Sequence, residues 1–148
     1  MNNIQNILVP IDFSETSKRA LLFASTLAQQ YNAKLTLLFV YQAPTSFFPE
    51  GYEPSIGMMF DDLYQYYEKS LAGAAKGVEE ELSRAPNMKL SRGTPDVEIV
   101  REATEGDYDL IVMGSHGRTG MSRVFLGSVA EKVLRHAVCP TLIVPRQK

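Results

Sequence analysis

The sequence is poor in the residues that build disulfide-linked or metal-held scaffolds. Among its 148 residues Cys139 is the only cysteine, and His116 and His136 are the only histidines. A single cysteine cannot form an internal disulfide, and structural zinc needs a cluster of cysteine and histidine ligands. The sequence therefore excludes an internal disulfide framework and argues against structural zinc. We expect the Cys139 thiol to be buried and inert.

Long apolar runs and an excess of one charge are also absent. No stretch approaches the about 18 apolar residues that a membrane span needs, and residues 1–6 lack the basic start of a signal peptide. Lys and Arg number 15 against 17 Asp and Glu, for a net charge of -2, so a broad nucleic-acid surface is not expected. We expect a cytoplasmic protein that binds neither membranes nor nucleic acid, in which any polyanion site is local.

What remains is the composition of an ordinary globular protein. Hydrophobic residues make up 45% and charged residues 22%, which excludes a disordered or fibrous chain. The length predicts a single domain over residues 1–148.

Short apolar runs alternate with helical patterns along the chain. Residues 7–11 are rich in branched side chains, as is typical of a strand buried on both faces of a parallel sheet. Ser14 is a suitable N-cap for the helix that follows, and Asn32 suits the left-handed stop at its end. Further strands are expected at 35–40, 88–92 (an edge strand), 110–113 and 141–144, with helices at 58–83, from Pro95, and from about 128, where Val129, Ala130, Val133, Leu134 and Ala137 form one face. This alternation predicts an α/β fold, an open, doubly wound, five-stranded parallel sheet with four helices.

Residues 42–57 interrupt the alternation. Pro44, Pro49 and Pro54 lie within this stretch, which predicts an irregular loop of unusual length. Aromatic and methionine residues are dense in and after it, and we expect most of them to pack the loop and second helix onto the sheet, with part of the set available as a lid or partner surface. They are Phe47, Phe48, Tyr52, Met58, Met59, Phe60, Tyr64, Tyr66 and Tyr67.

A glycine-rich stretch, residues 114–128, follows the fourth predicted strand. Ligands of doubly wound sheets bind beyond the carboxyl ends of the strands, and glycines permit positive φ and close approach of the backbone to a phosphate. The N-terminus of the last helix adds aligned N–H donors, and Arg118, Arg123, Ser122 and Ser128 add charge and hydroxyls. The stretch fits a phosphate site; the alternative is a flexible loop with a helix cap. No Gly-Lys pair and no Gly-x-Gly-x-x-Gly after the first strand occurs, so the two best-known phosphate motifs are excluded.

Three further polar residues have competing interpretations. Asp12 follows the first strand, where it can cap a turn or contact a ligand, and its place at the switch point favours a ligand. His116 can donate to a phosphate, but no orienting carboxylate supports a catalytic role. His136 near the end of the last helix is explained by the helix dipole.

The spacing Gly114-x-x-Gly117, nine residues, then Gly127-Ser128 resembles the nucleotide-binding motif of the universal stress protein family, in its ATP-binding branch. The resemblance runs the whole chain, through blocks at 7–12, 93–95, 109–114 and 139–145. It implies an adenine nucleotide alpha hydrolase-like fold with strand order 3-2-1-4-5 and ATP across the ends of strands one and four.

The family pattern assigns residues to parts of the nucleotide. It implies that Asp12 contacts the ribose or phosphates, that the Val40 backbone reads the adenine edge, and that Gly117, Gly127 and Ser128 hold phosphates. The nucleotide-binding residues we predict are Pro10, Ile11, Asp12, Val40, Met113, Gly114, His116, Gly117, Arg118, Arg123, Gly127, Ser128 and Val129. A bulky residue in place of Gly114 or Gly117 should then abolish binding and leave the fold intact.

The resemblance also implies a function, that of a dimeric regulatory ATP-binding protein of the stress response. Mg²⁺ would accompany ATP, with Asp12 and Ser128 as its contacts. Family members pair their last strand with its twin, which predicts a homodimer through residues 141–145. The alternative is a slow ATP hydrolase or phosphate-transferring enzyme that uses the same loop. Its turnover would be slow because no arginine finger, lysine or glutamine is recognisably placed for fast turnover.

Overall fold

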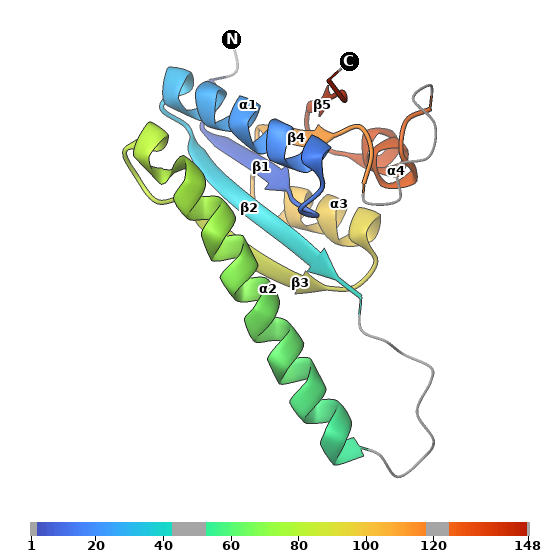
Figure 1. The fold of residues 1–148 in the computed structure, drawn as a ribbon. Helices are drawn as coiled ribbons and strands as arrows, with labels where there is room; N and C mark the ends of the chain where they lie inside the picture. The colour runs from blue at the N-terminus through green and yellow to red at the C-terminus, as the bar shows by residue number, and fades with distance from the viewer. Residues whose placement is uncertain (1–2, 43–52, 118–124, 148) are drawn as a thin grey trace.

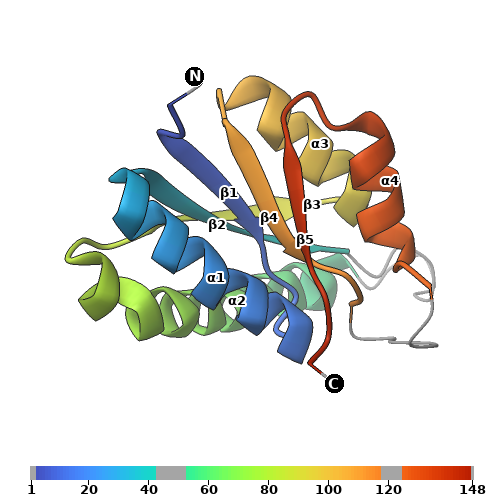
Figure 2. The same ribbon diagram turned by 90° about the horizontal axis from the view of Figure 1, so that it is seen from above.

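The computed structural model describes residues 3–42, 53–117 and 125–147, and for 53–58 it describes the backbone. Within these residues, parallel strands form one 5-stranded sheet in the order β3-β2-β1-β4-β5. Helices α1 and α2 lie on one face and α3 and α4 on the other (Figures 1 and 2). The elements are β1 (Asn6–Pro10), α1 (Glu15–Tyr31), β2 (Lys34–Tyr41), α2 (Glu53–Leu82), β3 (Asn87–Arg92), α3 (Pro95–Glu105), β4 (Leu110–Gly114), α4 (Ser128–His136) and β5 (Thr141–Val144). The predicted doubly wound α/β sheet and its strand order are confirmed.

A separate apolar cluster lies on each face of the sheet. Side chains of a strand alternate between faces, so Ile7 and Val9 of β1 join the cluster under α1 and α2. Leu8 joins Ala130 and Val133 of α4 in the cluster on the other face. Burial on both faces explains why the central strand is an unbroken apolar run.

The expected limits of α1 and the turn into α3 are also confirmed. The Ser14 side chain accepts a hydrogen bond from the Ser17 N–H at 3.2 Å, which caps the first turn of α1. Asn32 ends the helix with φ 52°, in the left-handed region. Pro95 lies in the first turn of α3, where the missing N–H costs little.

Two expectations about the helices are wrong. The irregular segment predicted for 42–57 ends sooner, because α2 begins at Glu53 and places Pro54 in its first turn, where proline is tolerated. Residues 43–52 lie outside the described part of the chain. Leu134 does not join the buried face of α4: it is 43% exposed, because the contact of α4 with the sheet is made by Ala130 and Val133 together with the partly buried Val129 and Ala137.

Part of the expected aromatic packing is present between α2 and the sheet. The ring of Tyr67 lies 4.5 Å from that of Phe39, and the Arg92 guanidinium lies 5.1 Å from the centre of the Phe60 ring. Tyr66 is 63% exposed, and Met59 and Tyr64 also remain exposed. Phe47, Phe48, Tyr52 and the Met58 side chain lie outside the described residues. No helix in the described ranges is long and apolar enough to cross a membrane.

Candidate functional site

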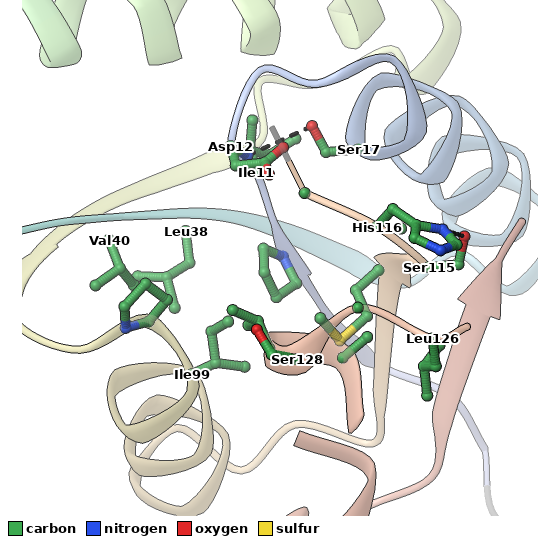
Figure 3. Close-up of a pocket in the computed structure, with 18 of the residues that line it drawn as sticks. Ile11, Asp12, Ser17, Leu38, Val40, Ile99, Ser115, His116, Leu126 and Ser128 are labelled. Atoms are coloured by element: carbon green, nitrogen blue, oxygen red, sulfur yellow. Dashed lines mark hydrogen bonds between the residues drawn. The ribbon is translucent and has the colours of Figure 1, made fainter. Parts of the chain in front are cut away.

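A cavity of about 610 Å³ opens at the carboxyl ends of β1, β2 and β4, beside the first turns of α3 and α4 (Figure 3). Every predicted site residue in the described part of the chain lines it, drawn from four separate segments of the sequence. They are Pro10, Ile11, Asp12, Val40, Met113, Gly114, His116, Gly117, Gly127, Ser128 and Val129. Arg118 and Arg123 lie outside the described residues.

Other residues line the cavity that the sequence interpretation did not include. They are Ser17, Leu38, Pro95, Ile99, Ser115, Phe125, Leu126 and Ala130. Strand alternation could have found Leu38, because it lies two residues before Val40 and so on the same side of β2. Ile99 lies one helical turn after Pro95. That α3 reaches the cavity at all follows from the tertiary packing and from no local pattern.

The cavity has an apolar side and a polar side. Leu38, Val40 and Ile99 lie together at one side, with Ser128 next to Ile99, and Asp12 and Ser17 lie across the opening from them (Figure 3). Such a division suits a ligand with a flat, weakly polar portion and a polar or charged portion.

Asp12 holds the turn between β1 and α1 while it lines the cavity. Its Oδ1 accepts hydrogen bonds from the Ser14 N–H at 2.9 Å and from the Ser14 hydroxyl. The Asp12 N–H in turn donates to the Ser17 Oγ at 3.4 Å. Phe13, between Asp12 and Ser14, has φ 64°, an unusual conformation for a bulky residue. The hydrogen bonds between the two flanking residues stabilise it. The capping role weighed for Asp12 is therefore real, and it leaves the residue on the cavity wall.

The segment after β4 is held from three directions. The Ser115 N–H donates to the Val144 carbonyl of β5 at 3.0 Å, and the Ser115 carbonyl accepts from the Gly127 N–H at 2.7 Å. The hydroxyl of Thr16, in the first turn of α1, donates to the His116 carbonyl. The start of the glycine-rich stretch thus has a defined backbone path.

The glycines at 114, 117 and 127 all lie close to neighbouring atoms. A Cβ at Gly114 would lie 2.9 Å from the Thr16 carbonyl carbon, and one at Gly127 would lie 3.0 Å from the Ser115 oxygen. A Cβ at Gly117 would lie 2.8 Å from the Asp12 Oδ2. None of the three has φ in the left-handed region, so close approach, and not positive φ, is the property of glycine that these positions use. Gly114 abuts α1 backbone, so the expectation that a bulky residue there spares the fold is wrong.

The N-terminus of α4 opens on the cavity without a side-chain cap. Its N-cap is Gly127, which has no side chain to accept from the first N–H groups of the helix. Ser128 and Val129 follow in the first turn and line the cavity. The first N–H groups of the helix, which no described side chain caps, and the positive end of the helix dipole make this end of the helix suited to an anion.

The two histidines differ in their surroundings. His116 Nδ1 lies 2.8 Å from the Ser115 Oγ, while its Nε2 is buried and finds no hydrogen-bond partner among the described residues. His136 Nδ1 lies 2.9 Å from the Lys132 carbonyl in the last turn of α4, where the helix dipole favours positive charge.

The surroundings of Cys139 support the expectation of an unreactive thiol. Cys139 is half-buried, and burial, followed by the charge of Asp109, raises the pKa of its thiol, which disfavours the reactive thiolate.

The described ranges contain no group of three or more His, Cys, Asp or Glu residues that could hold a metal ion. Asp12 and Ser128 both line the cavity, as one carboxylate and one hydroxyl.

Comparison with known proteins places this geometry in a family. The universal stress protein family matches residues 3–145. A universal stress protein of Methanocaldococcus jannaschii is 33% identical over 147 residues, which cover 99% of this chain and 85% of that protein. The solved structure of UspA from Lactobacillus plantarum has a TM-score of 0.84 at 26% identity and covers 97% of this chain and 99% of its own. A universal stress protein solved in complex with cAMP has a TM-score of 0.69 at 26% identity over 99% of this chain and 100% of its own. Because the family match spans nearly the whole sequence, the chain belongs to the universal stress protein family.

Proposed function

We propose that this chain is a cytoplasmic, single-domain ATP-binding protein that acts as a dimeric regulator in the stress response. One observation carries the nucleotide site: the described residues of the predicted binding set, far apart in sequence, line one cavity with an apolar side and a polar side. A relative of similar fold was solved with an adenine nucleotide, cAMP, which supports the ligand class.

The two sides of the cavity divide the proposed ligand. The adenine would pack among Leu38, Val40 and Ile99, where burial of its flat surface is favourable. The phosphates would lie at Gly117 and at the uncapped first turn of α4, where N–H groups can donate to them. Arg118 and Arg123 are included in the proposed phosphate site only because of their charge and their place in the sequence.

A magnesium ion would be held mainly by the nucleotide. Mg²⁺ usually keeps several waters and binds through one or two carboxylates together with substrate phosphates. Asp12 and Ser128 fit that pattern, since they supply one carboxylate and one hydroxyl on the cavity wall. When bound, the ion would neutralise part of the phosphate charge.

Slow hydrolysis or phosphate transfer at the same site is the second candidate. His116, with a buried Nε2 next to the cavity, is the observation that favours it. Against it, the described lining residues include no lysine, arginine or glutamine of the kind that stabilises a transferring phosphoryl group. Binding without efficient turnover is therefore the function we put first.

Two measurements test the proposal. Mass spectrometry of the purified protein should detect an adenine nucleotide, and calorimetry should show saturable heat on titration with ATP and magnesium. Absence of both would overturn the nucleotide site. Product formation followed over hours separates the two candidates, because a rate equal to that of buffer alone excludes the hydrolase.

The proposed dimer uses the exposed side of β5. This strand lies at the edge of the sheet, and an uncovered edge of apolar residues invites pairing with another strand (Figure 2). Val138, just before the strand, is 63% exposed. Sedimentation at micromolar concentration should give a dimer, and a monomer would contradict this part of the proposal.

A further inference from the structure

Thr16 is a buried polar residue that belongs to neither the predicted binding set nor the cavity wall. It is 3% exposed and lies in the first turn of α1. Its hydroxyl donates to the carbonyl of His116, which is 100 residues away in the sequence. A buried hydroxyl that joins two distant segments beside a candidate site has a specific structural task.

That hydrogen bond sets the orientation of one peptide group. In a planar trans peptide the C=O of one residue and the N–H of the next point in opposite directions. The His116 carbonyl points to Thr16 on the α1 side of the sheet, so the Gly117 N–H points away from α1. Gly117 lines the cavity, and α4, whose first turn carries the other proposed phosphate donors, lies on the opposite face from α1 (Figure 2).

The neighbouring peptide is fixed as well. The Ser115 carbonyl accepts from the Gly127 N–H at 2.7 Å, on the α4 side. Two successive carbonyls are thus held toward opposite helices, and the backbone between them cannot rotate without loss of a hydrogen bond. The close approach of α1 depends on Gly114, whose absent Cβ would lie 2.8 Å from the Thr16 Oγ1.

Thr16 also links the turn at Asp12 to the peptide group of His116. Its Oγ1 lies 3.3 Å from the Ser14 Oγ, and the Ser14 hydroxyl donates to the Asp12 carboxylate. A continuous run of polar groups therefore joins Asp12 after β1 to His116 after β4. Both ends of this run adjoin the cavity.

We propose that Thr16 is a positioning residue, which aims the Gly117 N–H at the phosphates of the bound nucleotide. The inference rests on the proposed function and deepens it, because it concerns the phosphate portion of the ligand alone. Loss of the Thr16 hydroxyl should weaken binding of ATP and leave the contacts of the adenine and ribose intact.

The test compares ATP with adenosine in calorimetric titrations of three variants. Thr16→Val keeps the shape of the side chain and removes its donor, and it should weaken ATP binding by about tenfold and adenosine binding by less than about twofold. Thr16→Ser keeps the hydroxyl and should restore ATP binding. Thr26→Val is the matched control, because Thr26 is an exposed threonine of the same helix whose hydroxyl donates to the Leu22 carbonyl at 3.2 Å.

A second measurement needs no variant and covers the case in which Thr16→Val does not fold. The backbone amide resonance of Gly117 should move strongly downfield when ATP is added to the unmodified protein, and little when adenosine is added. Equal losses of ATP and adenosine binding in Thr16→Val, or an unmoved Gly117 resonance, would overturn the inference alone. Failure of the unmodified protein to bind ATP would overturn the proposed function and the inference with it.

Discussion

The two strand-to-helix junctions at the cavity, β1 to α1 and β4 to α4, have similar positions and different chemistry. At the first, the Ser14 side chain caps α1 by accepting from the Ser17 N–H, and Asp12 accepts from Ser14. At the second, the N-cap of α4 is Gly127, which offers no side-chain acceptor. Both helices begin at the carboxyl edge of the same sheet.

The difference separates a structural helix start from one suited to a ligand. The first N–H groups of any helix need acceptors, and α1 finds one within its own chain. In α4 the residues that carry these groups, Ser128 and Val129, line the cavity, where an anion can accept from them. Because Gly127 has no side chain, it cannot cap α4, and the first turn of α4 can approach Ser115.

Among substitutions at these two junctions, Gly114→Ala should have the largest effect on stability. The new Cβ would lie 2.9 Å from the carbonyl carbon of Thr16, and backbone cannot move aside as a flexible side chain can. We expect the free energy of unfolding to fall by about 1–3 kcal/mol, as for other overpacked sites. Urea titration followed by circular dichroism measures it.

Gly73→Ala in α2 is the matched control for Gly114→Ala. A Cβ at Gly73 would meet no described atom within 4 Å, and alanine is the better helix former. Its free energy of unfolding should rise by about 0.5–1 kcal/mol. Equal stability of both variants would show that the approach of α1 to the β4 junction is not tight.

Gly117→Ala should act on the ligand more than on the fold. Among the described residues, its Cβ would meet only the Asp12 Oδ2, at 2.8 Å, which is the end of a side chain and can shift. The methyl group would then occupy space beside the proposed phosphate contacts. We expect affinity for ATP to fall about tenfold, or about 1.4 kcal/mol, with an unfolding midpoint near that of the unmodified protein. An unchanged affinity would remove Gly117 from the site.

Ser14→Ala removes the cap that distinguishes the β1 junction. The Ser17 N–H would lose its acceptor, so the free energy of unfolding should fall by about 1 kcal/mol. Ser14→Asn, which supplies another capping side chain, should recover most of that loss in the same urea titration. If Ser14→Ala were as stable as the unmodified protein, the two junctions would not differ in the way described.

Much of this fold follows from periodicity, and its failures have local physical causes. Branched apolar runs and the residues Ser14 and Asn32 marked β1 and α1 correctly, because burial and capping are short-range requirements. The start of α2 at Glu53 was missed, since Pro54 marks a helix start as readily as a loop. Leu134 was misplaced because helical spacing does not show how wide the contact with a sheet is.

The candidate site was predictable where it depends on one segment and not where it depends on two. Asp12 and Gly117 could be chosen from their places after a strand and within a spaced motif. The Thr16 bond to His116 spans segments that only the folded sheet brings together. The left-handed Phe13 was equally hidden, because no local pattern assigns positive φ to a bulky aromatic residue.

Ser128→Ala should have the smallest effect on stability and complete the contrast with Ser14. Ser128 lies in the first turn of α4, is exposed, and is not the N-cap. Its removal should change the free energy of unfolding by less than about 0.5 kcal/mol, as at ordinary surface positions. Because its hydroxyl would contact phosphate or magnesium, ATP affinity should still fall by roughly threefold, within the range of one hydrogen bond. A loss of stability as large as that of Ser14→Ala, with ATP affinity unchanged, would make both serines structural and leave α4 without its proposed anion.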